Sequence, residues 1–273
     1  PRTPTPTMNR IDLTFQSLAA AKRKALVAYL TAGDPNYETS LAILRKACAS
    51  GVDVLELGVP FSDPTCDGPV IQVASERALK SGMSLSKSIR LSGDLRRETQ
   101  TPIVLFSYYN PLFKYGLERV AHEAAEAGVD GMLVVDLPPE EAGPLAAALA
   151  GKEIHLIRLA APTSKPERIR MLASGAGGFL YLITRLGVTG TGGLDYAEVA
   201  KHAARVKAVC PHPVCLGFGI STGEDARALA PLADGLVVGS ALVRVVAQAP
   251  AGADLPELVA AKIRELRAGM DNA

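Results

Sequence analysis

The chain has 273 residues, of which 48% are hydrophobic and 21% charged, a composition that fits a folded globular protein and excludes a disordered or collagen-like chain. Its 29 Lys and Arg residues balance 28 Asp and Glu residues, so the formal net charge of +1 gives no support to binding of nucleic acid or anionic membranes through bulk charge. No apolar run approaches the roughly 18 residues that span a bilayer, and no basic-then-apolar signal sequence opens the chain, so we expect a cytoplasmic protein.

Residues 1–7 are rich in Pro and Thr, and we expect them to form a flexible lead-in to one folded domain over residues 8–273. In that domain, short apolar runs alternate with longer segments of helical periodicity, the pattern of βα units around a parallel sheet. The expected strands are Ala25–Leu30, Val54–Leu57, Ile103–Tyr108, Met132–Val135, His155–Leu159, Phe179–Ile183, Val214–Leu216 and Leu236–Val238. The expected helices are Tyr37–Ala49, Val70–Lys80, Leu117–Ala127, Glu140–Ala150, Pro166–Ala173, Tyr196–Val209, Glu224–Leu229, Ala241–Ala249 and Pro256–Ala268.

A faint internal repeat supports this arrangement, because residues 50–53 (SGVD) and 127–130 (AGVD) each place a Gly at the end of a helix, just before a strand. Eight such units in a chain of this length favour a closed (β/α)8 barrel of about 250 residues, the TIM barrel, over an open doubly wound sheet. In such a barrel the active site lies at the C-terminal ends of the strands. Only residues at those ends are therefore candidates for catalysis.

Glu56 interrupts the otherwise apolar run of residues 54–58, where burial of an unpaired ionised carboxylate would be costly. One interpretation is a Glu paired with a Lys or Arg inside the barrel. The other is a general acid and base, because desolvation raises the pKa of a carboxyl group toward neutrality, where it can both give and take a proton.

The loop after that strand, residues 60–69, is rich in Pro, Gly and Asp and carries Asp63 and Asp67. Such residues commonly form turns, which is the simpler interpretation of both. Because the loop lies just beyond Glu56 on the catalytic end of the barrel, we keep these two carboxylates as candidates.

Glycine-bearing turns follow the last two expected strands, at residues 217–221 and 238–240. Glycines let backbone N–H groups approach an anion closely, and the helix that begins at Ser240 adds its positive N-terminal end. Two such turns on adjacent strands predict a phosphate site, with ordinary tight turns as the alternative. Gly190, after the sixth strand, would complete it.

The chain has no Trp, seven Tyr and six Phe, so the placement of its aromatic residues is informative. Several lie near the C-terminal ends of the expected strands, where we expect a flat apolar pocket, although ordinary core packing would account for each one separately. These residues are Tyr29, Phe106, Tyr108, Tyr181 and Phe218.

Other kinds of catalytic site find little support in the sequence. None of the four histidines falls at a C-terminal strand end, which argues against a histidine-built metal site. No Lys ends an expected strand, so a Schiff-base mechanism lacks its nucleophile, and Cys66 has no His near it in sequence. We therefore expect a phosphorylated substrate with an apolar ring, handled by carboxylates without metal or cofactor.

Seven motifs together resemble the tryptophan synthase alpha subunit family, over residues 8 to about 267 and in the family's order. The most specific of them is the segment ELGVPFSDP, from Glu56 to Pro64. The motifs are Leu30–Pro35, Glu56–Pro64 with Asp67–Gln72, Tyr108–Pro111, Asp136–Pro138, Gly187–Gly190, Gly217–Ser221 and Gly239–Ser240.

The resemblance implies a barrel that cleaves indole-3-glycerol phosphate to indole and glyceraldehyde 3-phosphate by a retro-aldol reaction. Glu56 would be the general acid and base, Asp67 would accept a hydrogen bond from the ring N–H, and Tyr181 would be an accessory active-site residue. The resemblance also implies two sets of binding residues. Gly190, Gly219, Gly239 and Ser240 would hold the phosphate, and Tyr29, Ile71, Phe106, Tyr108, Leu133 and Phe218 would line the indole pocket.

The family acts in an α2β2 complex with a pyridoxal-phosphate beta subunit that receives indole through a tunnel. Matching positions place this contact near Asp63, Pro64 and Asn110. Residues 185–193 resemble a mobile lid in which Thr189 positions Asp67.

The sequence departs from the family's pattern at Thr65–Cys66, which replace a small apolar pair, and at the glycine-rich run 191–193. Three other functions stay as alternatives: a stand-alone lyase that releases free indole, a non-catalytic allosteric subunit that binds the phosphate ligand, and another phosphate-binding barrel such as a sugar-phosphate epimerase. The intact acids oppose the second, and the lack of histidines or a lysine at strand ends opposes the third.

Overall fold

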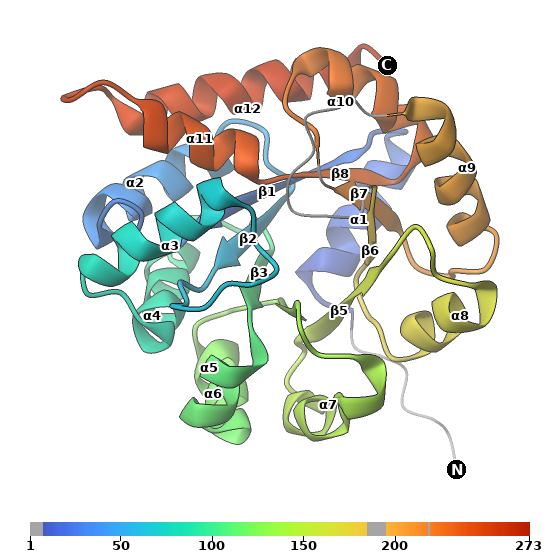
Figure 1. The fold of residues 1–273 in the computed structure, drawn as a ribbon, viewed down its shortest axis with the longest axis horizontal. Helices are drawn as coiled ribbons and strands as arrows, with labels where there is room; N and C mark the ends of the chain where they lie inside the picture. The colour runs from blue at the N-terminus through green and yellow to red at the C-terminus, as the bar shows by residue number, and fades with distance from the viewer. Residues whose placement is uncertain (1–7, 185–194, 218) are drawn as a thin grey trace.

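The computed structural model describes residues 8–184, 195–217 and 219–273. In this part of the chain eight parallel strands, each paired with the next, form a closed barrel in which β8 pairs with β1 (Figure 1). The strands are β1 (Ala25–Thr31), β2 (Val54–Gly58), β3 (Ile103–Ser107), β4 (Gly131–Val134), β5 (His155–Ala160), β6 (Leu180–Ile183), β7 (Val214–Gly217) and β8 (Gly235–Val238). The predicted (β/α)8 barrel is therefore confirmed, and every predicted strand matches an observed one within one residue at each end.

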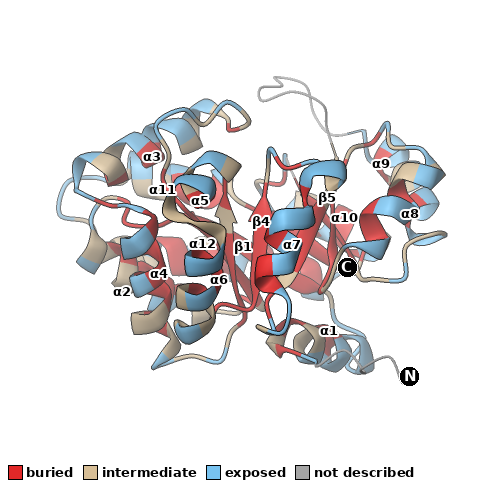
Figure 2. Cartoon of the chain, turned by 90° about the horizontal axis from the view of Figure 1, so that it is seen from below, coloured by how far each residue is buried: buried red, intermediate tan, exposed pale blue. Residues whose placement is uncertain are grey.

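Helices surround the barrel and present exposed outer faces, while the strands are almost continuously buried (Figure 2). The α-helices are α1 (Arg10–Ala20), α2 (Tyr37–Cys48), α3 (Pro69–Lys80), α4 (Leu85–Arg96), α5 (Tyr109–Tyr115), α6 (Leu117–Glu126), α7 (Gly143–Leu149), α8 (Pro166–Ser174), α9 (Tyr196–Lys207), α10 (Gly223–Leu229), α11 (Ser240–Gln248) and α12 (Leu255–Asp271). Two short 3-10 helices, η1 (Pro139–Glu141) and η2 (Ala230–Leu232), complete the described elements. None of the described helices is long and apolar enough to cross a membrane.

The predicted helix Glu140–Ala150 is wrong in its first three residues. The chain instead forms η1 and then starts again as α7 at Gly143, followed by Pro144. Proline has no N–H to donate to the carbonyl one turn earlier, so Pro144 is tolerated in the first turn of a new helix but not in the interior of a helix that began at Glu140.

The barrel interior is filled from one end. Inward-facing residues such as Val27, Val54, Val104 and Leu133 form one buried cluster with Ile11, Phe15 and Leu18 of α1. These three side chains lie on one face of α1, so this helix covers the N-terminal end of the barrel. The C-terminal ends of the strands are then the end where a cavity can form.

Aspartates that precede strands fix neighbouring strands in register. Asp53 accepts a hydrogen bond from the backbone N–H of Leu26, and Asp130 accepts one from Ile103, both at 2.8 Å. In each copy of the predicted repeat, the glycine before this aspartate has a positive φ, 107° at Gly51 and 72° at Gly128, which glycine adopts without strain. The predicted helix ends at these glycines are thereby confirmed.

Candidate active site

A cavity of about 280 Å³ lies at the C-terminal ends of the strands. It brings together residues from β1, β2, β3, β6 and β8 and from the loops and helices after them. Its lining comprises Tyr29, Glu56, Asp67, Gly68, Ile71, Phe106, Tyr181, Gly219, Ile220, Ser221, Val237, Gly239, Ser240, Ala241 and Arg244.

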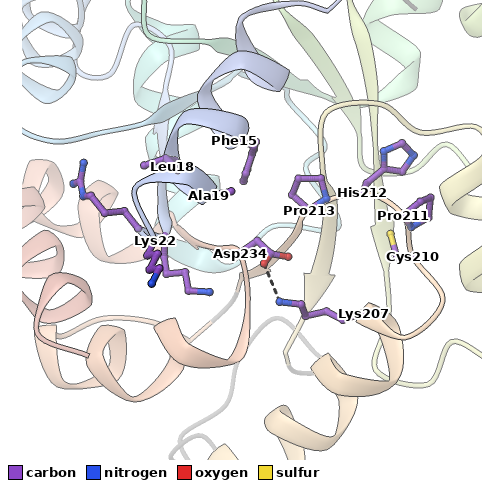
Figure 3. Close-up of a pocket in the computed structure, with 12 residues that line it drawn as sticks. Phe15, Leu18, Ala19, Lys22, Lys207, Cys210, Pro211, His212, Pro213 and Asp234 are labelled. Carbon is purple, nitrogen blue, oxygen red and sulfur yellow. Dashed lines mark hydrogen bonds and ion pairs between the residues drawn. The ribbon is translucent and has the colours of Figure 1, made fainter.

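A larger groove of about 680 Å³ lies at the opposite end of the barrel, between α1 and residues 207–213 (Figure 3). Its one carboxylate, Asp234, pairs with Lys207 at 2.8 Å and accepts the N–H of Val214, so it is already used in holding the structure. None of the sequence-predicted site residues lines this groove. We therefore take the smaller cavity, which holds two desolvated acids, as the candidate site.

Glu56 lies on β2 and faces the barrel interior, with only 1% of its surface exposed. Its Oε1 has no hydrogen-bond partner, and no Lys or Arg among the described residues forms an ion pair with it. Burial raises the pKa of this carboxyl group to about 8. Among the described residues the interpretation of Glu56 as half of an interior ion pair therefore finds no support, and the group can act as a proton donor near neutral pH.

Asp67 ends the loop that leads into α3 and is 8% exposed. Burial raises its pKa to about 6, although a hydrogen bond from Tyr108 opposes the shift. The Tyr108 hydroxyl donates to Asp67 Oδ2 at 3.0 Å and accepts the backbone N–H of Cys66 at 3.0 Å. The same tyrosine thus holds both the carboxylate and the loop that carries it.

Two glycines make room for the tyrosines of the cavity wall. A Cβ on Gly58 would lie 2.2 Å from the Tyr29 hydroxyl, and a Cβ on Gly217 would lie 2.2 Å from that of Tyr181. Any larger residue at either strand end would displace a ring. Tyr29 in turn meets Phe106 edge to face, with ring centroids 5.2 Å apart, which gives the cavity an aromatic wall.

The part of the cavity next to Tyr29 offers backbone groups suited to an anion. Gly239 precedes α11 and packs so close to Tyr29 that a Cβ there would lie 3.3 Å from a ring-bearing carbon. The N–H groups of Ser240 and Ala241, the first two of α11, have no acceptor within the helix, and the helix dipole makes this end positive. Gly219, with φ of 85°, also lines the cavity. This end of the cavity can therefore bind a phosphate group.

The structure brings most of the predicted site residues into this cavity. Those that line it are Tyr29, Glu56, Asp67, Ile71, Phe106, Tyr181, Gly219, Gly239 and Ser240. Tyr108 reaches the site through its bond to Asp67, and Leu133 is fully buried in the barrel interior below. Thr189, Gly190 and Phe218, with the predicted lid at 185–193 and the lead-in at 1–7, lie outside the described residues.

Sequence reasoning missed two features of the site. The bond between Tyr108 and Asp67 joins residues 41 positions apart, and no local pattern indicates it. Arg244, on α11, was also missed, although its position four residues after Ser240 puts both on one face of the helix. Among the described residues, no group of three or more His, Cys, Asp or Glu side chains is arranged to hold a metal ion.

Comparison with known proteins agrees with this geometry. The family model for "Tryptophan synthase alpha chain" matches residues 15–273. The tryptophan synthase alpha chain of Desulfosudis oleivorans is 50% identical over 261 residues, covering 96% of this chain and 98% of that protein. That of Desulfatibacillum aliphaticivorans is 51% identical over 239 residues, covering 88% and 90%. The crystal structure of the alpha subunit from Legionella pneumophila str. Paris superposes with a TM-score of 0.91 at 38% identity, covering 98% of this chain and all of that one.

Proposed function

The chain belongs to the tryptophan synthase alpha chain family, and from this premise we propose that its cavity cleaves indole-3-glycerol phosphate to indole and glyceraldehyde 3-phosphate. Members of this family are lyases of tryptophan biosynthesis. The observation that carries the proposal is the pair of buried carboxyl groups, Glu56 and Asp67, in a cavity that ends at the N-terminus of α11.

Glu56 is the general acid and base. With a pKa of about 8 it is largely protonated at neutral pH, so it can protonate the indole carbon that carries the side chain. Removal of the proton from the hydroxyl next to the breaking bond then lets that oxygen form the aldehyde. The electron pair of the broken carbon–carbon bond returns to the ring, which leaves as indole. One group near neutrality serves both proton transfers.

Asp67 stabilises the charge that develops in the ring. Protonation at carbon makes the ring nitrogen electron-poor, and a carboxylate that accepts its N–H bond lowers the energy of this state. Because its pKa is about 6, Asp67 is ionised at neutral pH, as this role requires. The bond from Tyr108 holds the carboxylate in place before the substrate binds. Tyr181, buried on β6 at the same cavity, is the accessory residue.

The rest of the cavity holds the two ends of the substrate. Tyr29, Phe106 and Ile71 contact the flat indole, and the backbone at Gly219, Gly239 and Ser240 holds the phosphate. Thr189, Gly190 and Phe218 complete this assignment by resemblance alone.

The family implies a beta-subunit partner. We propose that it binds the rim formed by Asp63, Pro64 and Asn110, in an α2β2 complex. Asp63 and Asn110 are exposed, on the loop that carries Asp67 and at the start of α5. This rim borders the two elements whose residues, Asp67 and Tyr108, meet in the cavity, so a partner there would act on the catalytic loop directly. The proteins matched above are alpha chains of tryptophan synthase and do not favour the stand-alone lyase.

The test is to incubate the purified chain with indole-3-glycerol phosphate and to measure indole and glyceraldehyde 3-phosphate together. We expect the two products in equal amounts, at a rate that rises strongly when a tryptophan synthase beta subunit is added. No indole under either condition would refute the proposed reaction. A full rate without the beta subunit would support the stand-alone lyase instead.

A further inference from the structure

Among the described residues one cationic side chain, Arg244, lines the cavity. It has no role in the proton transfers proposed above. Arg244 lies on α11, four residues beyond Ser240, so the two side chains lie on the same face of the helix. Both contribute to the cavity wall, together with Gly239. The Arg244 side chain is therefore attached to the helix one turn beyond the backbone groups that would hold the phosphate.

Arg244 makes no ion pair or hydrogen bond with any described residue, although its side chain is exposed and has carboxylates within the same cavity. Several other arginines of the molecule are used in structural pairs. Arg77 holds Asp34 at 2.8 Å, and Arg96 holds Asp130 at 2.7 Å. Arg244 has no such role toward the described residues, which leaves its donors available to a ligand.

The charge of the proposed substrate explains why such a residue is needed. A phosphate monoester carries about −1.5 to −2 charges at pH 7, whereas a helix N-terminus supplies the equivalent of only about +0.5. The other titratable groups of the cavity include the acids Glu56 and Asp67, and an ionised Asp67 repels an incoming anion. A guanidinium group offers paired donors that match phosphate oxygens.

We propose that Arg244 pairs with the phosphate of the substrate and so favours phosphorylated ligands over uncharged ones. This inference rests on the proposed function, since it adds a specificity-determining residue to the same site. Arg244 takes no part in the proton transfers. Its loss therefore weakens binding of the anion and leaves the chemical step nearly unchanged.

The experiment compares wild type, Arg244→Gln, Arg244→Lys and the control Arg227→Gln. Arg227 is an exposed arginine of α10 that does not line the cavity. For each protein, with the beta subunit present, we would measure kcat and KM for indole-3-glycerol phosphate, and the inhibition constants of inorganic phosphate and of indole.

For Arg244→Gln we expect KM and the inhibition constant of phosphate to rise together, about tenfold at low ionic strength, with less effect at high salt. We expect kcat and the inhibition constant of indole to stay within about twofold, because indole carries no charge. Arg244→Lys should recover part of the loss, and Arg227→Gln should behave as wild type.

Two results would overturn the inference. Unchanged phosphate inhibition in Arg244→Gln would show that the side chain does not reach the anion, and an equal rise for phosphate and indole would show general damage to the cavity. Failure of the proposed function is separate, because it would appear as absence of indole production by wild type and by Arg227→Gln alike.

Discussion

Burial of Glu56 should cost the folded protein stability in a way that depends on pH, and Glu56→Gln measures that cost. The group's ordinary pKa is 4.5, and burial raises it to about 8. As pH rises above 4.5 the unfolded chain loses this proton while the folded protein keeps it. The folded state therefore binds more protons, and its stability falls between these two values.

The size of the effect follows from the gap between 4.5 and about 8. At about 1.4 kcal/mol per pH unit, the total is about 5 kcal/mol, of which about 4 kcal/mol falls between about pH 5 and pH 8.5. The Gln side chain does not ionise, so the Glu56→Gln variant does not lose this stability as pH rises. Relative to wild type, the variant should gain about 4 kcal/mol in free energy of unfolding across that pH range.

The assay is urea unfolding of wild type and variant at several pH values, followed by circular dichroism. The matched control is Glu141→Gln, since Glu141 is an exposed glutamate whose charge is solvated in both states. We expect the difference between wild type and Glu56→Gln to grow steadily with pH, and the control to show almost none. A difference that stays constant from pH 5 to pH 8.5 would refute the assignment of Glu56 as a buried, largely protonated acid.

Further predictions concern the other groups of the cavity. Tyr108→Phe removes a bond that lowers the pKa of Asp67, so kcat should fall about fivefold to tenfold. The pH profile of kcat/KM should rise through about 6 as Asp67 ionises and fall through about 8 as Glu56 loses its proton. In Tyr108→Phe the pKa of Asp67 should be higher, so the rising part of this pH profile should move to higher pH. If it does not move, the rising part reports ionisation of the substrate phosphate instead. Ser240→Asp places a negative charge at the N-terminus of α11 and should raise KM more than about tenfold by like-charge repulsion, whereas unaltered KM would place the phosphate elsewhere.

The strands were predictable because a barrel strand packs on both faces. Each one reads as a short apolar run bounded by turn residues, as in residues 103–107. Eight such runs, with glycines at helix ends such as Gly51 and Gly128, were enough to favour a closed barrel.

Three helices were not predicted, and the reasons differ. In α4 the fully buried face includes Ser88 and Ser92, whose hydroxyls bond to backbone carbonyls one turn earlier, so the apolar period is interrupted. The helix α1 has the apolar period of a helix, but it precedes β1 and so lies outside the repeating βα units from which the helices were predicted. The short helix α5 follows β3 directly, and its first turn contains Pro111.

The residues of the candidate site were predictable where one short segment of sequence is enough to identify them. Glu56 stands out as a charge within an apolar strand, and Ser240 as the start of a helix after a glycine. The contact of Tyr108 with Asp67 depends on how separate elements pack, and so does the lack of a described partner for Arg244. Only the folded arrangement of β2, β3 and α11 makes them visible.

The most direct test of the whole account measures indole release from indole-3-glycerol phosphate by wild type, Glu56→Gln and Asp67→Asn, with inhibition by inorganic phosphate measured on the same samples. We expect each variant to lose at least about a hundredfold in turnover, while its affinity for phosphate stays within about twofold of wild type. Turnover close to wild type in either variant would remove that carboxyl group from the mechanism and contradict the account.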